Sequence, residues 1–217
     1  MAKIDSLRTL LVQQLRDLYD AEKRLTKAIP KLMKESSSDD LTSALEMHLG
    51  ETENQVSRLE RAFQTIGETA KGKECKGIKG IIEEGDEHVG EDFADDGLRD
   101  ATIIGAAQRV EHYEIAAYGT AIAHARLLGQ DEVVQLLEET LEEEKAADEK
   151  LTEVAEQIVN PDAASSEDED EEESDREMAG IGASSGSKSA SSGKRGPNGR
   201  SSGGNRRSAR SRSGRSR

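Results

Sequence analysis

The sequence predicts an all-α fold in which four long helices form an antiparallel bundle. Apolar residues recur every three or four positions along four segments, as they do on the buried face of a helix. Aromatic residues make up only 2% of the 217 residues, so Leu, Ile, Val and Ala must fill the core. Alternating runs of β-branched and aromatic residues, which are typical of strands, are missing. These observations favour one helical domain over residues 1–160.

The first two helices are expected to form a hairpin. Asp5 or Ser6 can cap the first helix, which should run to about Lys34. A polar turn at residues 36–40 then supplies the cap of the second helix, and Gly67 should end that helix. Helices that are joined by so short a turn lie antiparallel.

A long crossover connects this hairpin to a second one. Residues 67–97 are rich in glycine and contain a short amphipathic helix at about 78–89. The third long helix should then span 98–128 and stop at Gly129, and the fourth should span 131–159. The sequence therefore predicts two helical hairpins that pack against each other.

The end of the chain has a different composition. Asn160 and Pro161 should close the last helix, and residues 161–217 are expected to form a disordered tail. Residues 167–177 carry nine acids and one base, and the residues after them carry ten bases and no acid. The basic residues within 188–217 predict weak, non-specific nucleic-acid binding, which the acidic run beside them would oppose.

Charge and cysteine content limit the class of protein. The net charge of −15 favours a protein that stays in solution, and the acidic helical domain should repel nucleic acid. The single Cys75 excludes an intramolecular disulfide framework. No signal segment opens the chain and no apolar run is long enough for a bilayer, so we expect a cytoplasmic protein without membrane contact.

Metal-binding side chains interrupt the apolar faces of all four predicted helices. These side chains are Glu22, His48, Glu51, Glu111, Glu114, Glu144 and Asp148. A lone buried carboxylate costs several kcal/mol or takes up a proton, so several converging acids favour a cation. Single carboxylates from two helices, with paired ligands from two others, hold two metal ions in known four-helix bundles. The sequence thus predicts two Fe or Mn ions per chain.

The spacing also suggests what these side chains do. Glu144 and either Glu111 or Glu114 are the predicted bridging ligands, because they lie near the middle of their helices. Tyr19 or Tyr118 could orient a bound oxygen species or donate an electron, and both are predicted catalytic residues. The corresponding function is a ferroxidase-type oxidoreductase or a peroxide-handling protein.

Four segments resemble the YciE/YciF family of ferritin-like proteins: Asp17–Leu25, His48–Val56, Glu111–Tyr118 and Glu139–Asp148. The resemblance covers residues 5–158, and Glu-His-Tyr-Glu-Ile-Ala at 111–116 is its most specific part. It implies a ferritin-like four-helix bundle, a homodimer, a role in the stress response and ferroxidase activity.

The chain departs from the wider ferritin pattern in its ligand pairs. Many di-iron bundles use Glu-x-x-His, whereas His48 precedes Glu51 here, and Glu144 pairs with Asp148 without a histidine. More oxygen ligands favour harder ions such as Mn(II) or Fe(III) and lower the reduction potential. The pattern therefore supports metal binding more strongly than ferroxidase turnover.

The same acids also allow an alternative function that needs no metal. The acids could be held by Arg or Tyr side chains in a non-catalytic dimeric bundle, whose basic tail binds nucleic acid or another partner.

Three neighbouring residues are not expected to be ligands. Glu142 and Glu143 are expected on a solvated face, and His112 is expected outside the ligand set, near the ligands or at a subunit contact.

Overall fold

The structure is a computed structural model that describes residues 4–165 of the chain. Its helices are α1 (Leu7–Glu35), α2 (Asp39–Thr65), α3 (Lys76–Val89), α4 (Asp96–Leu127) and α5 (Asp131–Val154), and a π-helical turn follows at Ala155–Val159. No strand occurs within these residues, which confirms the predicted all-α class. No helix in this part of the chain is both long and apolar enough to cross a membrane.

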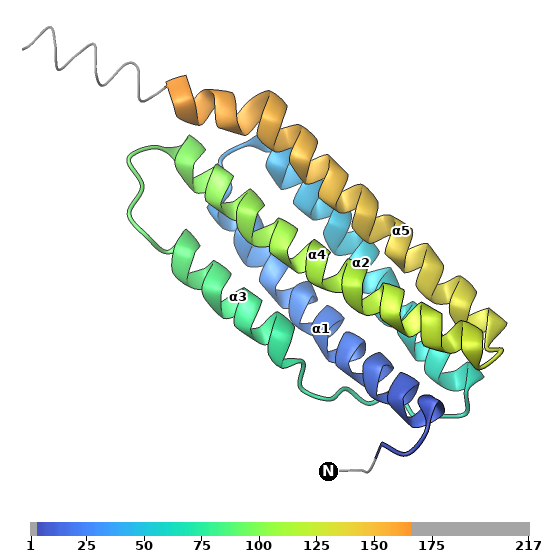
Figure 1. Ribbon diagram of the computed structural model, residues 1–217. Coiled ribbons are helices and arrows are strands. Elements are labelled where there is room, and N and C mark those ends of the chain that lie inside the picture. The colour runs from blue at the N-terminus through green and yellow to red at the C-terminus, as the bar shows by residue number, and fades with distance from the viewer. Residues whose placement is uncertain (1–3, 166–217) are drawn as a thin grey trace, which may run out of the picture. The chain divides into compact units, whose positions relative to one another are not determined.

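The four long helices form the predicted antiparallel bundle. Helix α1 packs against α2 and α4, and α5 packs against the same two helices, so the four close a ring around one core. Figure 1 shows them side by side, with α3 along the outside of the bundle. Because α3 packs on α4 and α1, the crossover covers one flank of the core and is part of the packed domain.

Local sequence signals position the helix ends. Ser6, Ser38 and Asp95 each accept a hydrogen bond from the backbone N–H three residues later, which satisfies a donor that the first turn would leave unpaired. Gly67 and Gly129 have φ values of 72° and 65°, which favour glycine, and they follow the ends of α2 and α4. The predicted starts and ends of the first three long helices are confirmed to within two residues.

The predicted end of the last helix near residue 159 is wrong. After the π-helical turn, helical conformation continues to Ser165, past Pro161. Ala163 is buried against the start of α4, where a Cβ atom on Gly97 would lie 3.0 Å from its Cα. The free energy gained by burying apolar groups in this last turn exceeds the cost of the backbone hydrogen bond that Pro161 cannot donate. Within the predicted tail at 161–217, residues 161–165 are thus helical, residues 166–217 lie outside the described residues, and the domain boundary at residue 160 stays a prediction.

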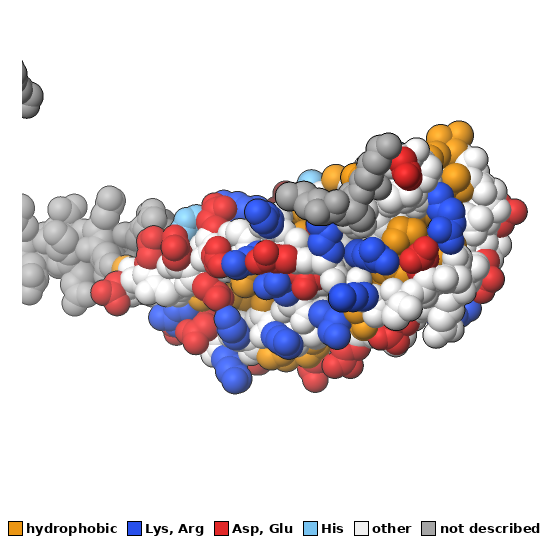
Figure 2. All heavy atoms as spheres, turned by 90° about the horizontal axis from the view of Figure 1, so that it is seen from below, with side chains coloured by type: hydrophobic (Ala, Val, Ile, Leu, Met, Phe, Trp, Pro, Cys, Tyr) orange, Lys and Arg blue, Asp and Glu red, His pale blue; other side chains and the backbone are white. Residues whose placement is uncertain are grey.

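Two apolar clusters fill the bundle, one toward each end. The first includes Leu15 on α1 and Leu137 on α5, and the second includes Leu25 on α1 and Leu151 on α5. All four long helices contribute to both clusters. On the outside, charged side chains of both signs intermingle on the face seen in Figure 2, with small hydrophobic groups between them. The core is thus divided, and a layer between the two clusters remains for polar residues.

Asp100 on α4 fixes the turn between α1 and α2, a role that the sequence did not indicate. The side chain is buried and accepts hydrogen bonds from the backbone N–H groups of Ser37 and Ser38, at 2.9 and 2.7 Å. We expect Asp100→Ala to lower the free energy of unfolding by about 1–3 kcal/mol, because two donors lose a charged acceptor. Urea unfolding measures this, with Glu91→Ala at an exposed position as control; equal midpoints would contradict the role.

Candidate metal centre

Five of the predicted ligands meet between the two apolar clusters. His48, Glu111 and Glu144 form one group and Glu22, Glu114 and Glu144 form another, and in each group the candidate ligand atoms lie within 4.8 Å of one another. The Nε2 atom of His48 is 3.3 Å from Glu111 Oε1 and 3.8 Å from Glu144 Oε2. Because Glu144 belongs to both groups, it is the residue best placed to bridge two ions.

All four long helices contribute to this centre because each carries one or two polar residues where its apolar stripe passes the middle of the bundle. Glu22 comes from α1, His48 from α2, Glu111 and Glu114 from α4, and Glu144 from α5. Glu111 and Glu114 share one face of α4 because residues three apart are neighbours on a helix. Glu51 and Asp148 also keep the expected spacing, but they belong to neither group.

The five side chains are almost completely enclosed and under-satisfied. Their exposed fractions lie between 0% and 6%. Within the described part of the chain, seven of their atoms have no hydrogen-bond partner: Glu22 Oε2, His48 Nε2, Glu111 Oε2 and both carboxylate oxygens of Glu114 and Glu144. Buried polar atoms in folded proteins are nearly always paired. The donor set, one imidazole and four carboxylates, therefore fits a metal ion.

Burial and mutual repulsion change the acidity of the four carboxyl groups. The pKa values of Glu22, Glu111 and Glu114 are raised well above the ordinary value, first by burial and then by neighbouring carboxylates. Burial also raises the pKa of Glu144, although the charge of His48 opposes this shift. Without a cation, the centre would hold protons in its place.

The two predicted catalytic tyrosines lie in different surroundings. Tyr118 is fully buried on α4, and its hydroxyl donates a short hydrogen bond to Glu22 Oε1 in the centre. The pKa of Tyr118 is raised by burial and by the neighbouring charge of Glu22. Tyr19 instead donates to Glu60 at 2.8 Å and packs edge-on against Phe63 in the first apolar cluster. Of the two, only Tyr118 contacts a candidate ligand.

Glu51 and Asp148 lie at the edge of the centre. Glu51 Oε2 is 3.4 Å from Nδ1 of His48, so it can orient the imidazole whose other nitrogen faces the acids. Asp148 accepts a hydrogen bond from Gln108 at 3.1 Å and lies 3.4 Å from His112 Nε2. Both carboxylates are about one-quarter exposed, and direct ligation by either residue stays a prediction.

An arginine beside the centre was not predicted. Arg58 on α2 donates to both carboxylate oxygens of Glu143, at 2.5 and 2.6 Å, and Gln55 donates to the same carboxylate at 3.1 Å. The predicted solvated position of Glu143 is therefore wrong, whereas Glu142 is exposed as expected. A signal was present, since Gln55 and Arg58 continue the helical face of His48.

This chain is a ferritin-like antiparallel four-helix bundle. It encloses four carboxylates and a histidine, and these side chains could hold metal. Within that class, the chain belongs to the family described as "Domain of unknown function (DUF892)", whose profile matches residues 6–164. The resemblance to the YciE/YciF family is confirmed by the relatives that match the same part of the chain.

The most similar proteins share most of their length with this chain. Protein YciF from Escherichia coli strain K12 is 42% identical over 159 residues, which are 73% of this chain and 95% of YciF. The solved structure of this E. coli stress protein matches with a TM-score of 0.69 and covers 72% of this chain and 99% of its own. YcfI from Rhodopseudomonas palustris, described as a candidate structural protein, is 46% identical, with a TM-score of 0.68 over 69% of this chain and 95% of YcfI.

Proposed function

We propose that this chain is a cytoplasmic di-metal carboxylate protein that binds two Fe or Mn ions and oxidises Fe(II) during oxidative stress. The observation that carries the proposal is the set of seven buried polar atoms, on five converging side chains, that have no hydrogen-bond partner among the described residues. A pair of cations would satisfy these atoms and balance the carboxylate charges in a single step.

The residues divide into two ligand groups around Glu144. His48 and Glu111 would hold one ion, Glu22 and Glu114 would hold the other, and Glu144 would lie between them. Carboxylate-rich sites favour hard ions such as Mn(II) and Fe(III). When bound, two Fe(II) ions supply one electron each to an oxidant, so that a peroxide can be reduced without a radical product.

The protein's own side chains would orient the ligands and hold protons. Glu51 fixes the imidazole of His48 from outside, and Tyr118 fixes the carboxylate of Glu22. The buried hydroxyl of Tyr118 is also the nearest candidate for an electron donor. The hydroxyl of Tyr19 donates a hydrogen bond to Glu60, which is not a candidate ligand, so Tyr19 would donate an electron only over a longer distance.

Metal content tests this proposal directly. We expect elemental mass spectrometry of the purified protein to find about two Fe or Mn ions per chain, as in di-metal bundles. The double variant Glu111→Gln, Glu144→Gln should lose them, because two of five ligands lose their charge. Glu142→Gln, at an exposed position on α5, is the matched control. Undiminished metal binding in the double variant would refute the site.

Oxygen uptake separates metal binding from ferroxidase activity. After anaerobic loading with Fe(II), consumption of oxygen or peroxide in proportion to iron supports oxidation at the centre. Two bound ions without any consumption would leave a metal-binding protein that is not an enzyme.

A second candidate function is a non-catalytic bundle, which the description of YcfI favours. In that case the four raised carboxyl pKa values reflect shared protons, and exhaustive chelation leaves the melting temperature unchanged.

We further propose that the protein is a homodimer, which sedimentation velocity tests. Nucleic-acid binding through residues 188–217, outside the described residues, should vanish at high salt if it occurs.

A further inference from the structure

An apolar pocket lies between α1, α2, α3 and α4 and extends to the metal centre. Its volume is about 40 Å³, and its walls include Leu25, Ile29, Leu45, Ile82 and Val110. Helix α3 covers the core along this flank, so the crossover forms part of the pocket wall. The wall is almost entirely hydrocarbon.

Two candidate ligands also line this pocket. They are His48 and Glu111, whose side chains are 7% and 2% exposed. The Nε2 atom of His48 and the Oε2 atom of Glu111 have no hydrogen-bond partner among the described residues. The pocket therefore reaches two side chains of the first ligand group, each of which has a buried atom without a hydrogen-bond partner among the described residues.

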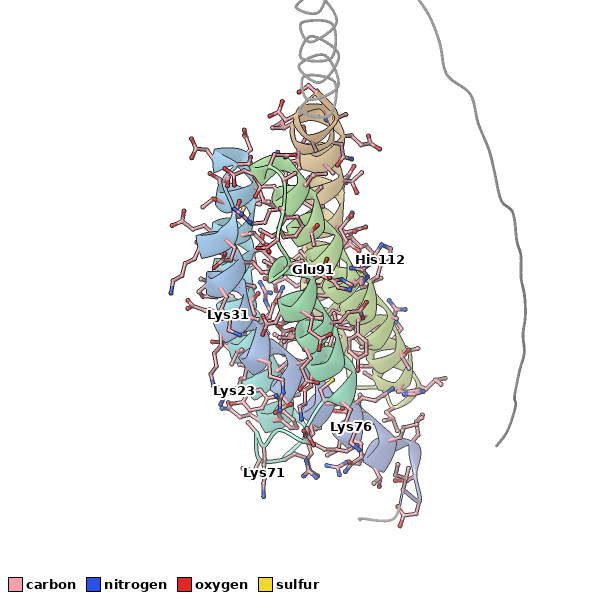
Figure 3. The ribbon with its side chains drawn as sticks, turned by 90° about the vertical axis from the view of Figure 1, so that its left-hand side faces the viewer. Lys23, Lys31, Lys71, Lys76, Glu91 and His112 are labelled. Atoms are coloured by element: carbon pink, nitrogen blue, oxygen red, sulfur yellow. The ribbon has the colours of Figure 1, made fainter. Side chains whose placement is uncertain are left out.

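Small residues keep the space open. Ala28 on α1, Gly85 on α3 and Ala106 on α4 all line the pocket, and a Cβ atom on Gly85 would lie 3.3 Å from the Cβ of Ala106. At the rim, Lys31 donates to Asp86 at 2.9 Å and so links α1 to α3. Figure 3 shows Lys31 on the flank of the bundle where α3 lies. This ion pair is exposed and can open at little cost.

Size and polarity decide what can enter. A water molecule needs roughly 10–15 Å³ of such space and two to four polar partners, and apolar cavities without partners stay dry. The pocket has room for a diatomic molecule, and its lining is apolar apart from Asp86, which accepts a hydrogen bond from Lys31, and the two candidate ligands His48 and Glu111. Hydrogen peroxide and hydrated metal ions would have to shed bound water along this wall, whereas dioxygen has little to shed.

We propose that this pocket admits dioxygen to the metal centre and that peroxide and metal ions enter elsewhere. The inference rests on the proposed function, since the electrons come from Fe(II): two Fe(II) ions would give one electron each, and dioxygen would take up these two electrons and two protons and leave as hydrogen peroxide. It goes further by naming the oxidant and its route.

Xenon, an apolar probe of similar size, tests the pocket without any metal. Crystals of the metal-free protein under xenon pressure should show xenon between α1 and α3. Ala28→Leu should exclude it by filling the pocket, whereas Thr26→Leu, which adds the same side chain outside the lining, should not. Absence of xenon from the wild-type pocket would overturn the proposal.

Kinetics with two oxidants tests the route. In the Fe(II)-loaded protein, Ala28→Leu should slow oxidation by dioxygen about tenfold, the effect of 1.4 kcal/mol on a barrier. Oxidation by hydrogen peroxide and the iron stoichiometry should not change, and Thr26→Leu, outside the lining, should not slow the dioxygen reaction. Equal slowing with both oxidants, or with neither, would overturn the proposed route. Bound xenon without any Fe(II) oxidation would instead contradict the proposed function.

Discussion

Removal of metal is expected to lower the melting temperature of this protein by about 10–20 °C. One site at a free metal concentration of one hundred times Kd adds about 2.7 kcal/mol, and two sites double this. In a domain of this size, 1 kcal/mol shifts the midpoint by about 2–4 °C. Calorimetry of the protein before and after chelation, with metal added back, measures the shift. An unchanged midpoint would favour the structural bundle.

Glu114→Gln should change the stability of the metal-loaded protein and that of the metal-free protein in opposite directions. In the metal-loaded protein, the substitution removes a charged ligand and lowers the melting temperature. In the metal-free protein, it removes a buried carboxyl group that the neighbouring acids repel, so stability should rise. The exposed Glu142→Gln should change neither form. A loss of stability in both forms would show that Glu114 acts through packing alone.

The stability of the metal-free protein should fall as the pH rises above about 5. The four central carboxyl groups have raised pKa values, so the folded state binds more protons than the unfolded state above the ordinary value of 4.5. The free energy of unfolding therefore falls with pH, by about 1.4 kcal/mol per unit for each extra proton bound. The loss ends once the pH exceeds the raised pKa values.

The metal-loaded protein should not show this loss, because bound ions keep the carboxylates ionised and metal binding releases protons. Urea unfolding of both forms from pH 5 to 8 makes the comparison. The lowered pKa of Asp20, which Arg24 and the Cys75 N–H cause despite burial, acts only at lower pH and does not interfere. A metal-free protein whose stability rises with pH in this range would contradict the prediction.

Local signals in the sequence were sufficient for most of the fold. Caps such as Ser38 and stops such as Gly67 depend only on backbone groups a few residues away, so they can be recognised without tertiary information. The last helix was misjudged because Val159 and Ala163 are buried against distant parts of the chain. Such burial can override the effect of a proline, and no local pattern reports it.

The centre could be predicted where a charged residue interrupts an apolar stripe. Glu22 and Glu144 stand in such positions, and both are fully buried. Spacing alone was less informative, since Glu51 keeps the interval of a ligand pair but lies partly exposed beside His48. Arg58 continues the helical face of His48, but its partner Glu143 lies 85 positions away in the sequence, so this pairing could be found only from the packed helices.

The polar layer between the two apolar clusters also limits how the helices can slide past one another. In a bundle filled only with Leu and Ala, a shift of one turn, about 5.4 Å, exchanges similar side chains at modest cost. Here the same shift would push the carboxyl group of Glu22 or Glu144 into hydrocarbon, away from the polar side chains that surround it. The acidic layer thus selects one alignment of four helices that otherwise resemble one another, and it does so before any ion binds.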